Sequence, residues 1–368
     1  MIIGITGADG LIGWHVRCRL YVEHDIEAIP IGRAGFREAG ALESFVSKCD
    51  AIVHLAGVNR GEESEVESVN PALARVLVSA MERCERTPHV VFASSTHIDS
   101  DTAYGRSKRA TEEIFSEWAG RCGAVFTNMV LPHVYGECGR PFYNSVVSTF
   151  CYQLAEDETP KIEQDGRLEL LHAQEVADLV LLSVRNRSVG EVRPSGRAMR
   201  VSEMLERVSL LAERYKSGVI PAFEDIFDLR LFNTFRSYLF PKHYPNLLKL
   251  NTDSRGSLFE AVKTDNGGQA FLSTTEPGIT RGDHFHFNKV ERFLVVQGQA
   301  VIRLRRMFDD KVIEFRVSGS EPTVVDMPTL HAHNITNTGD GELLTMFWSH
   351  EIFDPDHPDT HREQVAVG

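Results

Sequence analysis

The chain has 368 residues, of which 42% are hydrophobic and 25% charged, a composition typical of globular proteins with room for two domains. Its formal net charge of −13 argues against a nucleic acid or an anionic membrane as partner, although local basic loops could still hold a nucleotide-linked substrate. The six cysteines form no Cys-x-x-Cys pair, and we find no signal peptide or long apolar run, so we expect reduced thiols and a cytoplasmic protein.

The first residues predict a dinucleotide-binding loop. Residues 1–6, MIIGIT, are typical of a short buried strand, and residues 14–22 are expected to form a helix. Between them, GADGLIG places Gly7, Gly10 and Gly13 at the spacing G-x-x-G-x-x-G. Small residues let the backbone approach a pyrophosphate at the N-terminus of the following helix. Glycine-rich loops are common, so the prediction depends on the position of this one between a strand and a helix.

The second predicted strand, residues 26–31, indicates which cofactor is bound. It ends in Gly32-Arg33, with no acidic residue at its tip. A carboxylate there would accept the ribose hydroxyls of NAD, whereas an arginine can hold the 2′-phosphate of NADP. We therefore predict NADPH with Arg33 at its phosphate, the alternative being that Arg33 is a solvated loop charge.

Two further strands are predicted at residues 51–55 and 90–93. The third strand leads into HLAGVNR, where Ala56 and Gly57 are the small residues expected beside a cofactor. The fourth strand ends in Ser94-Ser95, nine residues before Tyr104-Gly-Arg-Ser-Lys108.

This Tyr-x-x-x-Lys string predicts acid–base chemistry. On a helix, residues i and i+4 share a face, so Tyr104 and Lys108 are expected to be neighbours. A nearby ammonium favours phenolate and would lower the pKa of the tyrosine toward the range of a general acid or base. The Ser95 hydroxyl can bind a substrate carbonyl, with Thr96 as the competitor for that role.

Together these residues resemble the extended short-chain dehydrogenase/reductases, which act largely on nucleotide sugars and have a doubly wound parallel sheet of the Rossmann type. The resemblance implies that Tyr104 transfers the proton, Lys108 steadies it and the nicotinamide ribose, and Ser95 polarises the carbonyl. His133 stands where that family often has asparagine, and Asn144 is either a substrate contact or a helix cap. The predicted cofactor-binding residues are Gly7, Asp9, Gly10, Leu11, Ile12, Gly13, Arg33, Leu55, Ala56, Gly57, Tyr104 and Lys108.

We expect this reductase domain to cover residues 1–245 and a second domain to cover residues 246–368. Residues 202–216 have apolar positions at helical spacing and predict a packing helix. The aromatic-rich residues 223–250 are interpreted as packing at the join between the domains. The tail, residues 354–368, is interpreted as an irregular surface strap, and its histidines, His357 and His361, as solvated.

Residues 277–298, PGITRGDHFHFNKVERFLVVQG, predict a metal site. His284 and His286 are two residues apart, and in a strand such residues point to the same face. Glu291 opens the next predicted strand, and His333 lies on a later one, after Pro328. Histidine and carboxylate ligands suit zinc, iron, nickel or manganese. Surface or packing histidines are the alternative.

The order of these residues resembles both halves of the cupin signature. The first half reads Gly278, His284-x-His286, Glu291 and Gly298, and the second reads Pro328, His333 and Asn337. Position 330, usually glycine, is leucine, so the turn before His333 is expected to differ. The resemblance implies a small β-barrel with the metal inside it and favours zinc, with iron or another divalent metal as alternatives. The predicted ligands are His284, His286, Glu291 and His333.

The fusion of the two domains resembles bifunctional enzymes of bacterial capsular-polysaccharide biosynthesis, over essentially the whole chain. HLAGVNR, YNSV-x-x-TFCY, DSRGS, PGIT-x-G-x-H and FDP-x-x-PDT carry this resemblance. It implies that the cupin domain epimerises C3 of a UDP-4-keto-6-deoxy-HexNAc and that the reductase domain then reduces C4, giving UDP-2-acetamido-2,6-dideoxy-L-talose. A homodimer is expected on the same basis.

Several points stay open at this stage. His331, Lys289 and Glu260 are all chemically able to serve as the C3 base. One alternative function is a C4 reductase whose cupin is purely structural. Another is a non-catalytic module that senses NADPH and a sugar, against which the complete Ser95, Tyr104 and Lys108 set argues.

Overall fold

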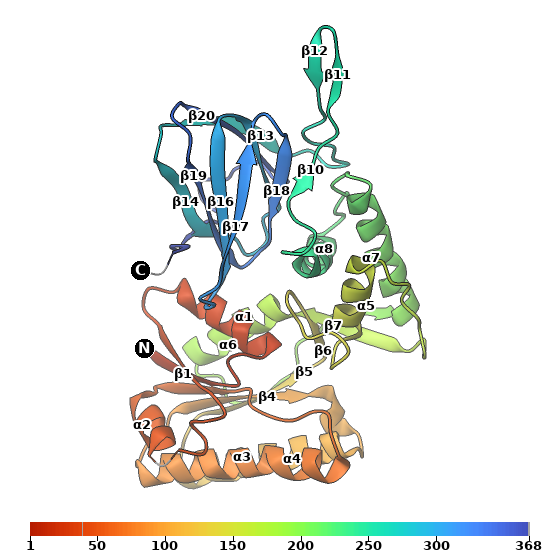
Figure 1. Cartoon of the computed structure of the whole chain (residues 1–368). Helices are drawn as coiled ribbons and strands as arrows, with labels where there is room; N and C mark the ends of the chain where they lie inside the picture. The colour runs from red at the N-terminus through yellow and green to blue at the C-terminus, as the bar shows by residue number, and fades with distance from the viewer. Residues whose placement is uncertain (39, 367–368) are drawn as a thin grey trace. The chain divides into compact units, whose positions relative to one another are not determined.

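The computed structural model describes residues 1–38 and 40–366 and consists of two compact units (Figure 1). The N-terminal unit comprises Met1–Thr149 and Ile162–Met204, and the C-terminal unit comprises Phe150–Lys161 and Leu205–Gly368. Helices α5 (Val146–Ala155) and α7 (Val201–Lys216) run from one unit into the other. The expected boundary between sequence domains at residues 245 and 246 stays a prediction.

A six-stranded parallel sheet forms the centre of the N-terminal unit, in the order β2-β1-β3-β4-β5-β8. The strand β3 is buried along its whole length, as expected for a parallel sheet covered on both faces. The four strands predicted from the sequence are confirmed as β1 to β4, with ends that differ by at most two residues. The bounds are β1 Ile2–Thr6, β2 Glu27–Ile31, β3 Ala51–His54, β4 His89–Ser95, β5 Phe126–Leu131 and β8 Gly190–Val192.

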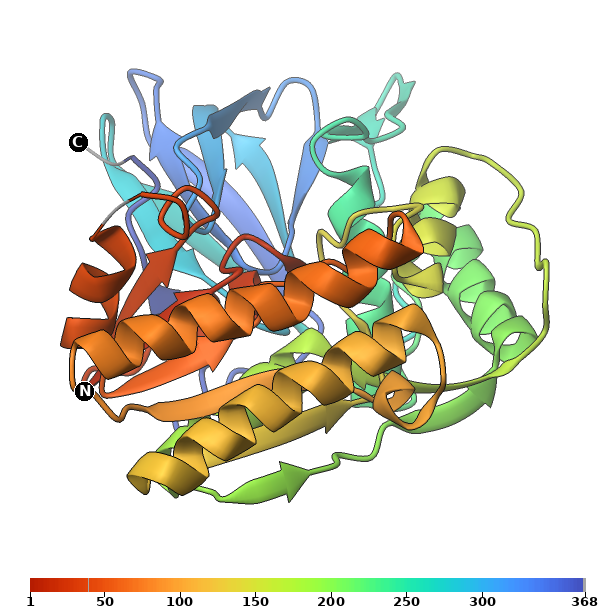
Figure 2. The same cartoon turned by 90° about the horizontal axis from the view of Figure 1, so that it is seen from below.

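Helices cover both faces of this sheet (Figures 1 and 2). One apolar core lies under α1 and α6, and another lies under α2, α3 and α4. A three-stranded sheet, β6-β7-β9, and the short 3₁₀ helix η1 complete the unit. The bounds are α1 Leu11–Tyr21, α2 Ala41–Lys48, α3 Glu63–Arg83, η1 Thr96–Asp99, α4 Ala103–Cys122, β6 His133–Tyr135, β7 Arg167–His172, α6 Ala173–Arg185 and β9 Arg197–Arg200.

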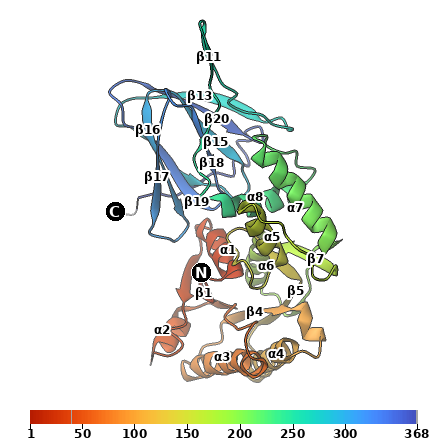
Figure 3. The same cartoon turned by 45° about the vertical axis from the view of Figure 1, so that its right-hand side comes forward.

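Antiparallel strands dominate the C-terminal unit (Figure 3). They form two five-stranded sheets, β10-β18-β15-β20-β13 and β17-β16-β19-β14-β21, and a separate exposed hairpin, β11-β12. Within the described residues these sheets stay open, so the expected closed barrel is not found. The bounds are β10 Asn246–Leu247, β11 Asn251–Asp253, β12 Gly256–Leu258, β13 Gln269–Thr275, β14 Thr280–Phe285, β15 Glu291–Gln297, β16 Gln299–Arg306, β17 Val312–Ser318, β18 Thr323–Met327, β19 His331–Asn337, β20 Leu343–Ser349 and β21 His361–Arg362.

A buried polar network joins two helices to the first of these sheets. The hydroxyl of Tyr215, near the end of α7, donates to Asp326 of β18, which also accepts two hydrogen bonds of 2.6 and 2.8 Å from Arg292 of β15. Arg236 of α8 (Ile226–Leu239) is fully buried and donates to the carbonyl of Met327 at 2.6 Å. The second half of α7 and all of α8 therefore pack as parts of the β-rich unit. No helix within the described residues is both long and apolar enough to cross a membrane.

We expect the change Asp326→Asn to destabilise the C-terminal unit strongly, because it leaves the guanidinium of Arg292 buried without a counter-charge. Loss of one partner of such a pair costs about 3–5 kcal/mol. The control is Glu314→Gln, which removes the partner of Arg303 in a more exposed pair and should cost about 0–1 kcal/mol. Urea unfolding followed by tryptophan fluorescence measures both, and equal losses in the two variants would contradict the assignment.

Candidate functional site

The glycine-rich loop is built for close backbone contact. Gly7 has a φ of +69°, and a Cβ placed on Gly13 would lie 2.3 Å from the carbonyl oxygen of Gly7. A Cβ on Gly7 itself would lie 2.8 Å from the backbone nitrogen of Ala56, so the loops that follow β1 and β3 adjoin. A side chain at Gly7 would therefore clash with the loop after β3, and one at Gly13 would clash with the loop after β1.

The N-terminus of α1 is open to a ligand. Gly10 is its N-cap and makes no side-chain cap bond to the N–H groups of the first turn. Such N–H groups attract a phosphate. Leu11 and Ile12 lie in this turn, Leu55 and Gly57 lie in the adjoining loop, and the side chain of Asp9 points outward to Arg17 at 3.3 Å. Arg33 follows β2 and is exposed, so the structure leaves its predicted role untested.

Asn70 is a supporting residue that sequence reasoning missed. It is 4% exposed on α3, its amide exchanges two hydrogen bonds with the backbone of Val58, and it also donates to the hydroxyl of Ser107 on α4 at 3.0 Å. It thus connects the loop after β3 to the helix that bears the predicted acid. A buried amide in the middle of a helix, directly before a proline, is the signal that could have identified it.

Tyr104 and Lys108 lie one turn apart on α4, as predicted. The ammonium nitrogen of Lys108 lies 5.5 Å from the centre of the Tyr104 ring and donates to the carbonyl of Ala93 in β4 at 2.8 Å. Burial lowers the pKa of Lys108 to about 8, because desolvation disfavours the charged ammonium.

The pKa of Tyr104 differs from the sequence-based expectation. Burial raises it to about 12, with a smaller contribution from Tyr143, so desolvation outweighs the neighbouring ammonium. The phenol is therefore protonated at neutral pH. This is the form required of a proton donor in the direction of ketone reduction.

The remaining predicted residues of this unit lie near the ends of β4 and β6. The Ser95 hydroxyl caps η1 by accepting from the N–H of His97 at 3.3 Å, and Thr96 is exposed. Ser145 accepts from the N–H of Ser148 at the start of α5, so the alternative that Asn144 caps this helix is wrong. The ring of His133 lies 3.3 Å from the Ser145 hydroxyl, and burial lowers its pKa to about 4.

The four predicted metal ligands converge in the C-terminal unit. One ligand atom from each of His284, His286, Glu291 and His333 lies within 4.8 Å of the others. One oxygen of Glu291 is 3.2 Å from Nε2 of His286 and 3.3 Å from Nε2 of His333. The residues come from β14, the loop after it, β15 and β19, and the pairing of His284 with His333 places β14 beside β19.

The carboxylate and one imidazole of this cluster are held in the charge states that metal ligands require. Burial alone would raise the pKa of Glu291, but His286 and His333 lower it well below its usual range, so the carboxylate is ionised. Burial and the two neighbouring imidazoles lower the pKa of His284 to about 3 and keep it neutral. Burial also opposes the charged form of His286, but Glu291 leaves its pKa raised. Ionised carboxylate and neutral imidazole are the forms that bind metals.

Backbone carbonyls orient two of these rings. Nδ1 of His333 lies 3.0 Å from the carbonyl oxygen of His331, and Nδ1 of His286 bonds the carbonyl of Asp359. Because a carbonyl only accepts, each Nδ1 carries the proton and each Nε2 faces the cluster. Metal-binding histidines are usually held in this way.

Asp359 is a second supporting residue that the sequence did not reveal. Its carboxylate accepts three backbone N–H bonds, from Phe287 at 2.8 Å, Asn288 at 2.8 Å and Lys289 at 2.9 Å. This turn connects His286 to Glu291. Asp359 therefore shapes the turn with its side chain and orients His286 with its carbonyl.

The tail is consequently more ordered than expected. Residues His361–Arg362 form β21, which pairs with β14 at His284 and Phe285. His361 is half-buried and lies 3.6 Å from the carboxylate of Asp359, so the interpretation of this histidine as solvated is wrong. His357 is exposed, as expected. The last two residues, 367 and 368, lie outside the described part.

The three candidate bases lie in different surroundings. Glu260 is exposed and pairs with Lys263 at 3.3 Å, and Lys289 donates to the carbonyl of Pro358 at 2.7 Å. His331 is buried on β19, two residues before His333, and therefore points to the same face of the strand.

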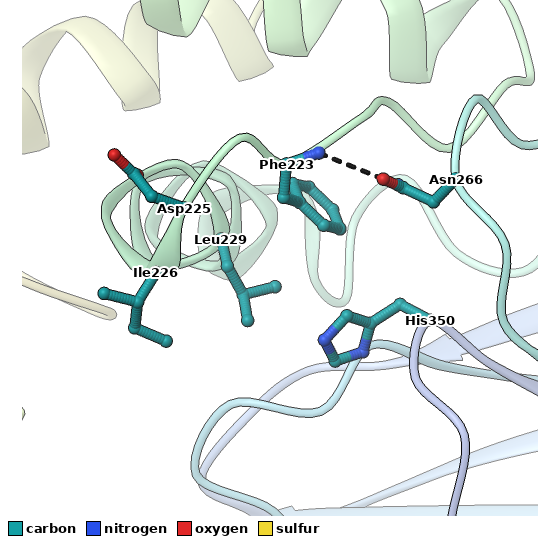
Figure 4. A pocket seen from close by; sticks show the side chains of 6 residues that line it. All are labelled: Phe223, Asp225, Ile226, Leu229, Asn266 and His350. Atoms are coloured by element: carbon teal, nitrogen blue, oxygen red, sulfur yellow. Dashed lines mark hydrogen bonds between the residues drawn. The ribbon is translucent and has the colours of Figure 1, made fainter.

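A pocket also opens at the start of α8, within the C-terminal unit (Figure 4). The backbone N–H of Phe223 bonds the amide oxygen of Asn266 at 3.1 Å at its rim. Nδ1 of His350 accepts from the N–H of Val290, which directly precedes Glu291, at 3.1 Å. His350 thus connects the lining of the pocket to the segment just before Glu291, and the lining contains no predicted site residue. Its lining is Phe223, Asp225, Ile226, Leu229, Asn266 and His350.

Comparison with known families finds one matching family for each half of the chain. Residues 3–193 match the NAD dependent epimerase/dehydratase family, and residues 251–361 match the polysaccharide biosynthesis C-terminal domain. The first match covers the parallel sheet with its glycine loop and Tyr104. The second covers all four residues of the histidine–glutamate cluster.

Two individual relatives match the chain over its full length, and a third matches part of it. The chain is 31% identical over 385 aligned residues, covering all of both chains, to the UDP-2-acetamido-2,6-beta-L-arabino-hexul-4-ose reductase of Pseudomonas aeruginosa. The crystal structure of the capsular polysaccharide assembling protein CapF from Staphylococcus aureus matches with a TM-score of 0.62 and 32% identity, over 99% of this chain and 100% of that one. The NADPH complex of RMD from Pseudomonas aeruginosa matches 58% of this chain and 85% of that one, with a TM-score of 0.53 and 17% identity, and shares the fold. The chain thus belongs to the NAD dependent epimerase/dehydratase family and carries a polysaccharide biosynthesis C-terminal domain.

Proposed function

We propose that the protein is a nucleotide-sugar ketone reductase of capsular-polysaccharide biosynthesis that carries a second, epimerising centre. In this proposal the C-terminal unit, a cupin, inverts C3 of a UDP-4-keto-6-deoxy-HexNAc. The N-terminal unit then reduces C4 to give UDP-2-acetamido-2,6-dideoxy-L-talose. The observation that carries the proposal is that each unit has its own complete cluster of chemical groups, in a chain related over its full length to a UDP-sugar reductase. We also propose that it works as a cytoplasmic homodimer.

In the N-terminal unit, the proposed cofactor is NADPH, which supplies hydride to C4 of the ketone when bound. The glycine loop that leads into α1, and the N-terminus of α1, where Gly10 carries no side-chain cap, fit its pyrophosphate. Arg33 fits the 2′-phosphate because no carboxylate stands at the end of β2.

The residues around the ketone have separate roles in this proposal. Tyr104, protonated at neutral pH, donates its phenolic proton to the C4 oxygen as negative charge develops there. Lys108, fixed by the carbonyl of Ala93, offers its ammonium to the phenolate that results. Ser95 binds the ketone oxygen through its hydroxyl and thereby orients it.

In the C-terminal unit, the donor set fits a divalent metal. The separations of 3.2 and 3.3 Å between the Glu291 oxygen and the two Nε2 atoms match the spacing of about 3.3 Å between ligands of a tetrahedral ion bound at about 2.0–2.1 Å. Three nitrogens and one carboxylate oxygen favour zinc or iron on chemical grounds, and zinc is our proposal because epimerisation needs no redox step.

The proposed epimerisation needs a base for the C3 proton. A metal in this site would supply Lewis-acid polarisation of the C4 ketone, which makes the C3 proton more acidic. Of the candidates, His331 shares a strand face with the ligand His333, whereas Glu260 is exposed and paired and Lys289 bonds Pro358. We therefore assign proton removal at C3 to His331. Return of a proton on the opposite face inverts the carbon.

We expect Tyr104→Phe to lower ketone-dependent NADPH oxidation by about 10²–10⁴-fold, because the C4 oxygen loses its proton donor. The dissociation constant for NADPH should stay close to that of the wild type, since the ring is kept. The matched variant is Glu291→Gln, which should abolish metal binding and inversion at C3 but leave reduction of a ready-epimerised ketone intact.

Two results would argue against these assignments. An unchanged oxidation rate in Tyr104→Phe would end the assignment of the acid and favour the sensing module. Glu291→Gln can also be given the unepimerised ketone. If its product then has the same C3 configuration as the wild-type product, the histidine–glutamate cluster has only a structural role.

We also expect Asp359→Ala to weaken zinc binding by about 10–100-fold, because the variant loses the bonds that shape the turn between His286 and Glu291. Asp359→Asn, which keeps an acceptor oxygen and tolerates the φ of +41° at this position, should fall in between. The control is Asp354→Ala, an exposed tail residue with local contacts alone. Competition with a chromogenic chelator measures all four proteins. Equal affinities would show that the tail has no part in the site.

A further inference from the structure

A second buried cluster lies in the N-terminal unit, and the proposed chemistry does not use it. It consists of His15 on α1, Glu137 just after β6, and His172 at the junction of β7 and α6. All three side chains are fully buried. One oxygen of Glu137 lies 3.0 Å from Nε2 of His15 and 3.2 Å from Nε2 of His172. A buried carboxylate shared by two imidazoles is costly to assemble unless its charge is balanced.

The state of His172 follows from its role as a helix cap. Its Nδ1 accepts from the backbone N–H of Gln174 at 3.3 Å, while Glu175 accepts from the N–H of His172 at 3.0 Å, which completes a capping box at the start of α6. Because Nδ1 acts as an acceptor, it carries no proton, and the proton of the neutral ring lies on Nε2. The N–H at Nε2 of His172 therefore faces the Glu137 oxygen at 3.2 Å, and the ring remains neutral.

The state of His15 follows in the same way. Its Nδ1 faces the carbonyl oxygen of Leu11 at 2.8 Å, and a carbonyl cannot donate, so Nδ1 carries a proton. Its Nε2 faces the carboxylate oxygen of Glu137. In a neutral ring with a proton on Nδ1, Nε2 carries no proton, and an ionised carboxylate carries none either. One additional proton must therefore lie between His15 and Glu137. That proton brings the total charge of the cluster to zero.

A metal ion would compete with this arrangement. Binding through Nε2 of His172 would move its proton to Nδ1, where it would face the N–H of Gln174 and break the cap of α6. The hydrogen-bonding pattern thus favours a shared proton over a cation, in contrast to the C-terminal cluster, whose Nδ1 atoms face carbonyl oxygens.

The location of the cluster indicates its role. Leu11, whose carbonyl anchors His15, lies in the first turn of α1, next to the glycine loop. Glu137 follows Gly136, where an added Cβ would lie 3.1 Å from Nε2 of His15, so the backbone approaches that ring closely. His172 stands opposite Tyr135 in the pairing of β6 with β7. Two segments far from α1 in the sequence, the one at Glu137 and the one at His172, are thereby held against the dinucleotide helix.

We propose that His15, Glu137 and His172 form a metal-free clamp, closed by one shared proton, that positions the first turn of α1 and thereby sets the affinity for the dinucleotide. The three are positioning residues rather than catalytic ones. The inference rests on the proposed cofactor role of the glycine loop. The clamp would make the affinity for the dinucleotide depend on the protonation state and the geometry of these three residues, which the glycine loop alone does not do.

The test is the dissociation constant for NADPH, measured by fluorescence titration of the full-length protein. We expect Glu137→Ala to raise it about tenfold or more, because two buried donors lose their acceptor and the turn is released. Glu137→Gln should raise it less than Glu137→Ala does, because the single atom that faces both rings can then accept from His172 or donate to a neutral His15, but cannot do both. The control is His89→Ala, which breaks a buried pair with Thr127 elsewhere in the same unit and should leave the constant unchanged.

A double variant separates positioning from folding. His15→Leu with Glu137→Leu replaces the charged pair by apolar side chains, which commonly preserves or raises stability. We expect this protein to fold, to bind NADPH about tenfold more weakly and to keep kcat at saturating NADPH. The double variant therefore still tests the clamp if Glu137→Ala does not yield folded protein.

Three outcomes would overturn the clamp. Wild-type affinity for NADPH in the double variant would show that the cluster does not position the helix. A dissociation constant for Glu137→Gln as high as that of Glu137→Ala would show that the charge itself is required. A metal ion that remains in Glu291→Gln and is lost when Glu137→Gln is added would replace the proton by a cation. If wild-type protein does not bind NADPH at all, the proposed function fails before the clamp is tested.

Discussion

Glu291 imposes the constraint on which the C-terminal unit depends. A carboxylate placed among β-strands and removed from water is stable only when positive charge or donated protons surround it. In the described residues no lysine or arginine pairs with Glu291, and the imidazoles of His286 and His333 lie within 3.2 and 3.3 Å of its carboxylate. The strand pairing of β14 with β19 and the turn fixed by Asp359 both serve to bring those rings to it. The proposed metal is the partner that would satisfy all of them at once.

The two units handle buried charge differently. In the N-terminal unit, burial lowers the pKa of Lys108, whereas Glu137 lies 3.0 Å from the imidazole of His15, with which we propose that it shares a proton. In the C-terminal unit, Asp326 is neutralised by Arg292 in a purely structural pair. Carboxylates that contact imidazoles therefore occur in the proposed metal site and in the proposed clamp, whereas the carboxylate that pairs with a guanidinium supports the fold.

The local patterns in the sequence were enough to predict the parts of the site that lie close together in the chain. The glycine spacing, the i,i+4 relation of Tyr104 and Lys108, and the His-x-His pair each follow from the geometry of one loop, helix or strand. His333 lies farther along the chain, but it could be predicted as a ligand because it occupies its place in the second half of the cupin signature. Asp359 could not, because it reaches His286 from more than seventy residues away, through its backbone carbonyl, an atom that every residue has. The pKa of Tyr104 was misjudged for a related reason, since burial depends on the whole fold.

The most direct test of two centres acting in sequence is NMR of the purified protein in D₂O with a UDP-4-keto-6-deoxy-HexNAc, first without NADPH and then with it. We predict that deuterium enters C3 before NADPH is added, that His284→Ala prevents this exchange, and that reduction at C4 follows once NADPH is present. Reduction at C4 with no deuterium at C3 in either stage would contradict the proposed epimerisation and leave the histidine–glutamate cluster as part of the scaffold.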